Sequence, residues 1–280
     1  MDISLFLCPT PIGNLGDITE RTLEVLRSVD IIAAEDTRNT LRLLNHFDIH
    51  TPLTSYHEHN KYEKAEELTG IMLSGKTVAL VTDAGTPGIS DPGEVLVKKA
   101  INAGLFITSL PGATAFVTAL TVSGLPSGRF VFEGFLPSKK AERKRILEDL
   151  AAGIRTVILY EAPHHLRETL SQLLEYFGEN RRIAVCRELT KVHEEILRMT
   201  LADAVEYYKE REPRGEYVLV LEGKTEKDVD LERQKEYEDM TIEDHVAMYE
   251  ALGNSRKEAM KKAAVDRGVS KREIYNALLT

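Results

Sequence analysis

The sequence predicts an α/β fold of two consecutive domains, followed by a small helical extension. Strand-like and helix-like segments alternate through residues 1–122 and again through residues 123–225. From residue 241 onward the hydrophobic pattern is purely helical. A chain of 280 residues can hold two domains of ordinary size, each with a core of its own.

The first domain, residues 1–122, is predicted to carry a mostly parallel sheet. Alternating strand and helix patterns imply βαβ units, in which a crossover helix connects parallel neighbouring strands. We expect strands at Leu5–Cys8, Ile31–Ala34, Thr77–Val81 and Phe106–Leu110. We expect helices at Thr19–Ser28, Thr37–Phe47, Lys61–Ser74, Glu94–Ala103 and Ala113–Val122.

The second domain, residues 123–225, begins where serine, glycine and proline interrupt the pattern between Ser123 and Gly128. A short connection joins the strand patterns at Ile183–Glu188 and Glu195–Met199, which predicts an antiparallel pair and therefore a mixed sheet. The other expected strands are Phe130–Gly134, Thr156–Glu161 and Tyr217–Leu221, and the expected helices are Lys139–Ala151, His164–Phe177 and Leu201–Glu210.

Residues 226–280 are predicted to form a charged linker and a module similar to a helix-turn-helix. The expected helices are Thr241–Ala251, Ser255–Asp266 and Ser270–Leu278, with Ser255 and Ser270 as N-caps. Residues 226–250 carry ten acids and three bases, whereas residues 251–280 carry seven bases and three acids. The basic end can therefore approach a nucleic acid although the whole chain is acidic.

Composition narrows the class of protein. A hydrophobic content of 42% and a net charge of −9 are typical of a globular chain, and no apolar run is long enough to span a bilayer. The first residues lack the basic flank and apolar core of a signal peptide, so we expect the cytoplasm and no membrane partner. Cys8 and Cys186 lie in apolar runs, which indicates buried thiols, and their spacing offers no metal site.

The most informative segment is Thr82–Gly93, which follows an apolar strand. Gly85, Pro87, Gly88, Pro92 and Gly93 fall within nine residues and exclude regular structure there. Such a loop at the carboxyl end of a strand is where open α/β sheets bind small ligands, because glycine lets a ligand approach the backbone. An ordinary strand-to-helix connection is the alternative.

Three further loops fall at strand ends, at Pro9–Asp17, Glu35–Thr40 and Pro111–Ala115. Several loops that converge at the carboxyl ends of parallel strands form a crevice. Thr114 could cap a helix or contact a ligand. Asp36 fits a helix N-cap, whereas Arg38 is less easily explained by capping. The first loop has neither a Walker nor a dinucleotide fingerprint, which disfavours a kinase or dehydrogenase.

Polar clusters at other strand ends are candidate substrate contacts. Tyr56 offers a ring for stacking, and His57, Glu58 and Asn60 offer hydrogen bonds, although a solvated loop also explains this segment. Arg187 and Lys191 place positive charge at another strand end, which suits phosphate. Solvation is a fair alternative for Lys191.

Taken together, these loops resemble the tetrapyrrole-methylase superfamily of S-adenosylmethionine-dependent enzymes, and most closely its 16S rRNA (cytidine-2′-O)-methyltransferase branch. The residues that carry the resemblance run in order through the chain: Thr10–Asp17, Ala34–Arg38, Ser55–Asn60, Thr82–Gly93, Leu110–Ala115 and Tyr160–His164. The match covers roughly Leu5 to Lys224.

The resemblance implies two α/β domains of tetrapyrrole-methylase type, with S-adenosylmethionine in the cleft between them. It also implies a homodimer that methylates cytidine 1402 of 16S rRNA, in the small ribosomal subunit. Glu161 departs from many tetrapyrrole-modifying relatives, in which that position is apolar. The residues that the resemblance assigns to the cofactor are Ile12, Ala84, Gly85, Thr86, Ile89, Thr114, Ala115, Glu161 and Leu189.

Methyl transfer from a sulfonium needs in-line alignment, and a ribose hydroxyl benefits from a proton acceptor. We expect Glu58 or His57 to be this acceptor, with Asp36 as a further candidate. The residues expected to hold RNA are Arg38, Tyr56, Asn60, Arg187 and Lys191. No metal is expected.

Two other functions stay open at this point. A tetrapyrrole C-methyltransferase would have a deep apolar cleft and no need of a basic tail. A non-catalytic RNA-binding factor in ribosome assembly would have little use for four cofactor loops.

Overall fold

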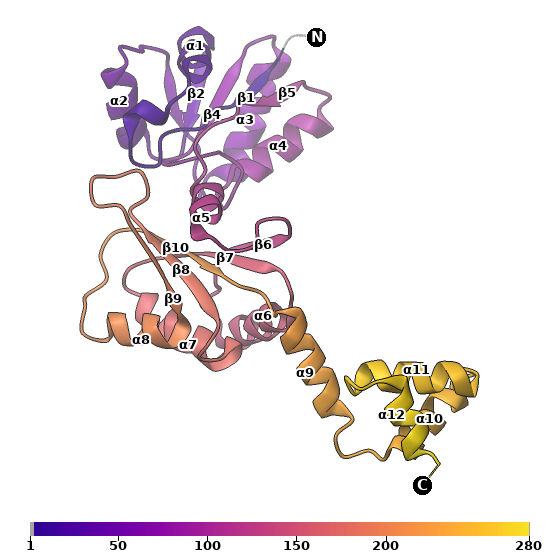
Figure 1. Cartoon of the computed structure of the whole chain (residues 1–280). Helices are drawn as coiled ribbons and strands as arrows, with labels where there is room; N and C mark the ends of the chain where they lie inside the picture. Colours follow the sequence, from indigo (N-terminus) through magenta and orange to yellow (C-terminus); the bar gives the residue numbers. More distant parts are fainter. Residues whose placement is uncertain (1–2, 280) are drawn as a thin grey trace. The chain divides into compact units, whose positions relative to one another are not determined.

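The computed structural model describes residues 3–279, apart from the side chains of residues 226 and 232. The chain divides into two compact units. One unit extends to residue 147 and includes residues 156–222, and the other combines residues 148–155 with residues from 223 onward. Both sheets belong to the first unit (Figure 1). The domain boundary expected at residue 123 therefore stays a prediction.

The first sheet is parallel throughout, as predicted, with the strand order β3-β2-β4-β1-β5. Its strands are β1 (Leu5–Leu7), β2 (Ile31–Ala34), β3 (Leu53–Ser55), β4 (Val78–Val81) and β5 (Ile107–Ser109). The helices between them are α1 (Glu20–Ser28), α2 (Thr37–His46), α3 (Lys61–Leu73) and α4 (Gly93–Asn102), and η1 (Leu15–Asp17) is a short 3-10 turn.

Strand β4 is buried on both faces, which explains its continuous apolar sequence. Val78 and Leu80 pack in a core cluster with residues of α3 and α4. Ala79 and Val81 point to the other face, where their cluster includes Leu26 of α1 and Leu44 of α2. Helices on both faces leave only the strand ends free for a ligand.

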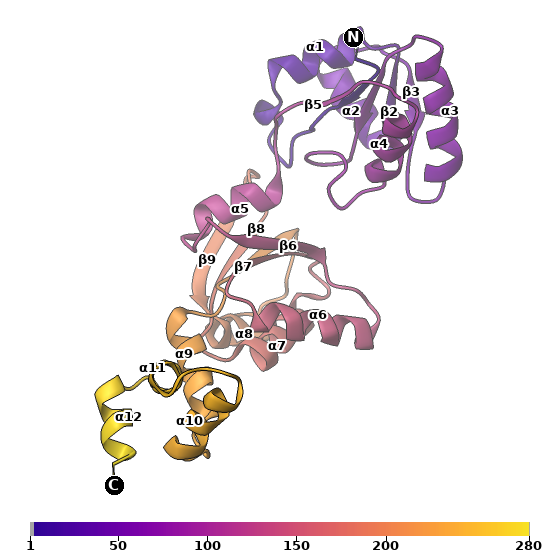
Figure 2. The ribbon, with the colours of Figure 1, turned by 90° about the vertical axis from the view of Figure 1, so that its right-hand side faces the viewer.

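The second sheet is mixed, as predicted, with the order β6-β7-β10-β8-β9. Only β6 and β7 run parallel, and β8 pairs with β9 antiparallel. One face is covered by α5 (Ala115–Ser123), and α7 (Leu166–Phe177) and α8 (Leu201–Lys209) lie on the other (Figure 2). The strands are β6 (Phe130–Phe135), β7 (Thr156–Glu161), β8 (Arg182–Arg187), β9 (Glu195–Thr200) and β10 (Tyr217–Leu221).

The helical end of the chain has a small core of its own, formed by Val246, Ala259, Ala263, Ala264 and Ile274. The predicted N-caps Ser255 and Ser270 are confirmed, and each forms a capping box with a glutamate three residues later. The helices of this end are α9 (Glu226–Glu236), α10 (Ile242–Ala251), α11 (Arg256–Asp266) and α12 (Lys271–Ala277). Helix α6 (Lys140–Ala152) lies earlier in the chain and precedes β7. Within residues 3–279, no helix combines the length and apolar character that a bilayer crossing needs.

Two elements differ from the sequence predictions. The expected linker after residue 225 begins with helix α9, which lacks an apolar stripe but starts at a capping box between Thr225 and Asp228. Strand β3 was not predicted, because it is a three-residue edge strand with polar Thr54 and Ser55.

Tyr56 is a core residue and not a stacking platform, which corrects the predicted RNA contact. Its side chain is 1% exposed, and burial raises its pKa to about 12. The hydroxyl donates to the Pro92 carbonyl oxygen at 2.9 Å and accepts from the Leu96 amide at 3.1 Å. It thereby satisfies an amide in the first turn of α4, at a helix end that lacks a side-chain cap.

We expect Tyr56→Phe to lower the free energy of unfolding by about 1–2 kcal/mol, because the buried Leu96 amide loses its acceptor. Urea denaturation measures this change. Tyr62→Phe is the control, since Tyr62 is 72% exposed and should change stability by less than about 0.5 kcal/mol. Unchanged stability in Tyr56→Phe would contradict the structural role of the hydroxyl.

Candidate functional site

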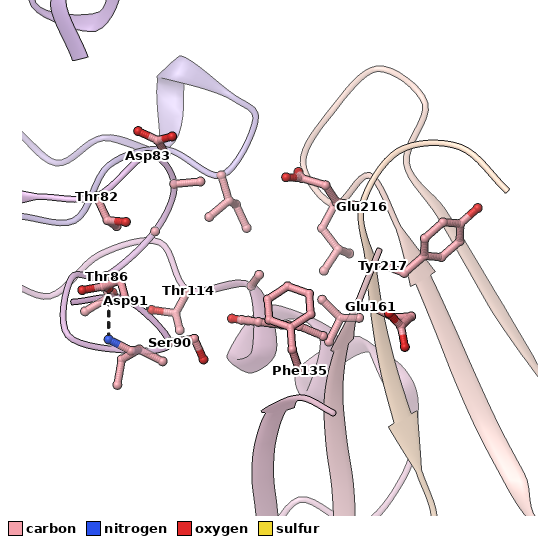
Figure 3. Close-up of a pocket in the computed structure, with 18 of the residues that line it drawn as sticks. Thr82, Asp83, Thr86, Ser90, Asp91, Thr114, Phe135, Glu161, Glu216 and Tyr217 are labelled. Carbon is pink, nitrogen blue, oxygen red and sulfur yellow. Dashed lines mark hydrogen bonds between the residues drawn. The ribbon is translucent and has the colours of Figure 1, made fainter. Parts of the chain in front are cut away.

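A cavity of about 440 Å³ lies where loops of the first sheet meet strand ends of the second (Figure 3). One wall comes from the loop after β4, with Thr82, Asp83 and Thr86, and from Thr114 at the start of α5. The facing wall comes from the ends of β6, β7 and β8 and the start of β10. Its volume is within the range of small-molecule sites.

Hydrogen bonds hold the first two loops together. Thr10 and Gly85 pair through two backbone hydrogen bonds of 2.9 and 3.0 Å, and the Thr10 hydroxyl donates to the Thr82 carbonyl at 3.0 Å. Gly85 has a φ of +86°, in the left-handed region that glycine adopts without a steric penalty. The loop after β1 and the loop after β4 therefore form one rigid wall.

The third loop joins this wall through two threonines. The Thr86 hydroxyl lies 2.8 Å from the Thr114 hydroxyl and donates to the Ala113 carbonyl at 3.1 Å. Within the second loop, the Asp91 carboxylate accepts from the amides of Gly88, Ile89 and Gly93. Asp91 thus fixes the loop that carries the cavity wall.

All nine residues that the resemblance assigns to a cofactor line this single cavity. They come from the loop after β1 (Ile12), the loop after β4 (Ala84, Gly85, Thr86, Ile89), the start of α5 (Thr114, Ala115), the end of β7 (Glu161) and the loop after β8 (Leu189). The prediction that the glycine- and proline-rich loops converge is therefore confirmed. The role of each residue stays a prediction.

Glu161 is held on the cavity wall by the second domain. It is 6% exposed, and its carboxylate accepts from the Ala162 amide at 2.8 Å and from the hydroxyl of Thr169 on α7. A buried carboxylate needs such donors to remain in place. Its position next to the cavity is fixed by strand β7 and helix α7 together.

The charge of the cavity has one sign. Five acids line it, and among the described residues no lysine, arginine or histidine does. A negative, partly enclosed site attracts a cation and repels phosphate. S-Adenosylmethionine carries a sulfonium and an ammonium group but no phosphate, so the residues present fit this molecule. The acids are Glu35, Asp83, Asp91, Glu161 and Glu216.

Glu35 and Asp83 are missing from the predicted site. The Thr82 hydroxyl donates to Glu35 at 2.6 Å, and the Asp36 amide donates to Asp83 at 3.1 Å. Partial desolvation raises the pKa of Asp83, and the neighbouring Glu35 and Asp36 carboxylates raise it further. The sequence did contain a signal, because both residues follow apolar strands that are neighbours in the sheet.

The three predicted proton acceptors do not line the cavity, which corrects that prediction. Asp36 is the N-cap of α2, and its hydrogen bonds with Arg38 lower its pKa to about 2, which makes it a weak base. Glu58 is bound to Lys61 on a largely exposed turn. The His57 amide donates to Asn60 at 2.8 Å and so serves the same turn.

The predicted RNA contacts also lie outside the cavity lining. The Arg38 side chain is 87% exposed and pairs with Asp36 at 3.0 Å. Arg187 lies 3.4 Å from Glu195, and Lys191 pairs with both Glu188 and Glu216. The Asn60 side chain stabilises its own turn through His57 and Ser55. Ion pairs thus engage Arg187 and Lys191, whereas the Arg38 side chain stays largely exposed.

Neither a metal nor a reactive thiol has support in the described part of the chain. Residues 3–279 contain no cluster of three or more histidine, cysteine or acidic side chains that could hold a metal ion. Cys8 and Cys186 are buried, and burial raises their pKa values to about 12 and about 11. Such thiols are poor nucleophiles.

The fold and the loop-lined cavity define a methylase of the tetrapyrrole type. Residues 4–205 match the family model Tetrapyrrole (Corrin/Porphyrin) Methylases. Among solved structures, uroporphyrin-III-C-methyltransferase from Thermus thermophilus has a TM-score of 0.55 at 19% identity, covering 78% of this chain and 94% of that one. The methyltransferase CobJ has a TM-score of 0.60 at 20% identity, covering 79% and 95%. These likenesses show the fold.

Within that class, the chain belongs to the family of ribosomal RNA small subunit methyltransferase I. It is 50% identical to the proteins of that name from Halalkalibacterium halodurans and Bacillus subtilis, over 98% of this chain and 93% of each relative. The protein of that name from Synechocystis is 46% identical over 98% of this chain and 97% of its own length.

We expect Gly85→Ala to destabilise the fold by about 1 kcal/mol and to weaken S-adenosylmethionine binding several-fold, because a Cβ is strained at this positive φ. Urea denaturation and calorimetry measure the two effects. Gly70→Ala is the matched control: Gly70 lies in α3 with open space around it, and the change should stabilise by about 0.5–1 kcal/mol. Wild-type donor affinity in Gly85→Ala would exclude this loop from the binding site.

Proposed function

We propose that this protein transfers a methyl group from S-adenosylmethionine to the 2′-oxygen of a cytidine ribose in 16S rRNA, at cytidine 1402. The observation that carries the proposal is the acidic cavity, in which loops of the first sheet and strand ends of the second bring together all nine expected cofactor positions. Near-full-length likeness to proteins named for ribosomal RNA methylation supports the substrate class.

The residues of the chain would bind the donor and align it for in-line transfer. Bound S-adenosylmethionine supplies an electrophilic methyl group on a positively charged sulfur. The Glu161 carboxylate and the rest of the acidic lining would stabilise that charge. Apolar side chains such as Ile12, Phe135 and Leu189 exclude water from the cavity wall.

Other parts of the proposal concern partners and place of action. We propose that the enzyme acts as a homodimer in the cytoplasm, on the small ribosomal subunit. Arg38 keeps an exposed side chain and remains a proposed phosphate contact outside the cavity. We no longer propose His57 or Glu58 as the proton acceptor, because neither lines the cavity.

The test is the loss and recovery of one modification. Mass mapping of 16S rRNA from cells that lack this protein should show one missing 2′-O-methylcytidine, which the intact gene restores. Purified protein should transfer labelled methyl groups to small subunits from those cells. An unchanged modification pattern would contradict the proposal, and methyl transfer to a tetrapyrrole instead would favour that rival. Donor binding without transfer to RNA would favour the non-catalytic factor.

The basic helices α11 and α12 are proposed to hold RNA. Lys257 and Lys261 are exposed on α11, whereas Arg267 is engaged with His245 and with the carbonyls of Met240 and Thr241. The free lysines are thus available to phosphate, whereas the hydrogen bonds of Arg267 stabilise this unit.

We expect the double substitution Lys257→Glu and Lys261→Glu to weaken binding of 16S rRNA about tenfold and to flatten its salt dependence. Donor affinity should not change. The control makes the same charge change on α9, with Lys227→Glu and Lys235→Glu. Fluorescence anisotropy at several salt concentrations measures RNA binding. Equal losses in the two double variants would indicate a general charge effect and not a contact surface.

A further inference from the structure

A second cavity, of about 350 Å³, lies between helix α2 and the loop after β1. Asn39, Arg42, Leu43 and His46 follow the spacing i, i+3, i+4 and i+7, which places them on one face of the helix. The facing loop contributes Thr10, Pro11, Gly13 and Leu15. This cavity contains none of the residues predicted to bind RNA.

The two cavities share Thr82 and Asp83. These residues directly follow β4, so a ligand in either cavity would reach the same point of the chain. A different open cavity, beside α5, also shares two residues with the first, Thr86 and Thr114, but it has no charged residue in its described lining. Of these two neighbours of the first cavity, the one beside α2 has the charged lining that a charged ligand needs.

The charges of the second cavity suit a nucleotide. Arg42 and His46 are exposed, and Arg42 has no ion-pair partner in the part of the chain that the structure describes. An unpaired guanidinium is a strong phosphate ligand. Asp83, at the other limit of the cavity, is a carboxylate that can accept a proton from a hydroxyl. A ribose with its phosphate presents both groups.

The environment of Asp83 distinguishes it from its acidic neighbours. Glu35 accepts from the Thr82 hydroxyl, and Asp36 is paired with Arg38. The Asp83 carboxylate accepts a hydrogen bond of 3.1 Å from the Asp36 amide. The second hydrogen bond, from the side-chain amide of Asn39, is longer, at 3.4 Å. Asp83 lines both cavities and is exposed to solvent. Partial desolvation and the nearby carboxylates of Glu35 and Asp36 raise its pKa.

We propose that the cavity beside α2 is the subsite for the acceptor nucleotide, in which Arg42 binds a backbone phosphate and Asp83 is the catalytic residue that accepts the ribose 2′-hydroxyl proton. This inference rests on the proposed function. The 2′-oxygen forms the C–O bond to the methyl carbon as the C–S bond breaks, and that electron pair remains on sulfur as a neutral thioether. The proton passes to the Asp83 carboxylate and then to water.

The first experiment separates chemistry from binding with two variants and their matched controls. Asp83→Asn keeps the acceptor oxygen for the Asp36 amide but cannot take a proton. Its control is Asp149→Asn, an exposed aspartate of α6 outside the described cavity linings. Arg42→Ala removes the phosphate ligand, and Arg21→Ala removes an exposed arginine of α1 that lines neither cavity.

We expect Asp83→Asn to slow single-turnover methyl transfer to small subunits at least about 100-fold. Calorimetry should give a donor affinity that is at most severalfold weaker, because Asp83 is one of the five acids that line the donor cavity, and the transfer rate is therefore measured with saturating donor. The thermal midpoint should stay within about 2 °C or rise, since a carboxyl with a raised pKa does not stabilise the folded state at neutral pH. In the wild type the rate of methyl transfer should fall as the pH drops through the pKa of Asp83. The charged and titratable groups near Asp83 are Glu35, Asp36, Arg42 and His46. The variant should lack that fall.

We expect Arg42→Ala to weaken binding of a 16S rRNA fragment about fivefold to tenfold, measured by fluorescence anisotropy without any donor. Arg21→Ala should bind as the wild type does. This readout does not depend on catalysis, and Arg42 is exposed, so folding is not at risk.

The outcomes distinguish the two proposals. If the wild type methylates a 16S ribose and Asp83→Asn is equally active, the subsite proposal is overturned. It is also overturned if Arg42→Ala and Arg21→Ala bind RNA with equal affinity. A transfer rate in Asp83→Asn that recovers fully once the donor is saturating also overturns the proton-acceptor role. A wild type that binds the donor but methylates no 16S ribose contradicts the proposed function itself.

Discussion

The site depends on the backbone pairing of Thr10 with Gly85. Strands β1 and β4 are neighbours in the middle of a parallel sheet, so the loops that follow them leave the same edge. Their two hydrogen bonds turn separate connections into one surface, and the Thr86–Thr114 contact adds the third loop. A glycine with a left-handed backbone at position 85 is what permits this pairing. The strand order therefore determines where the loop-lined cavity forms.

The two neighbouring cavities differ in the charge of their linings. The first has an acidic lining that favours a cation, whereas the second adds Arg42 and His46, which favour a phosphate. Asp83 belongs to both. A methyl donor that is positive at sulfur and an acceptor that is negative at phosphate would thus each be drawn to its own side. This division explains why a single strand end can serve both reactants.

Much of the fold could be predicted from sequence because apolar runs and helical periodicity are strong in this chain. The parallel sheet, the mixed sheet and the capped helices at Ser255 and Ser270 follow from such local patterns. Strand β3 and helix α9 have weak apolar patterns and were missed. Glycine and proline suffice to locate the loops that line the cavity, but the burial of Tyr56 and the capping role of Asp36 cannot be predicted in this way. Sequence shows that a polar residue follows a strand and does not show whether its side chain caps a helix, enters the core or faces a cavity.

The central claim is that the loops after β1, β4 and β5 bind S-adenosylmethionine against the end of β7. A crystal structure of the protein soaked with S-adenosylmethionine tests it most directly. The account predicts the donor against the backbone of Ala84–Thr86 and Ala162, with its methyl group directed toward Asp83. A donor bound beside α2, beside α5 or elsewhere on the surface, with the loop-lined cavity filled only by water, would contradict it.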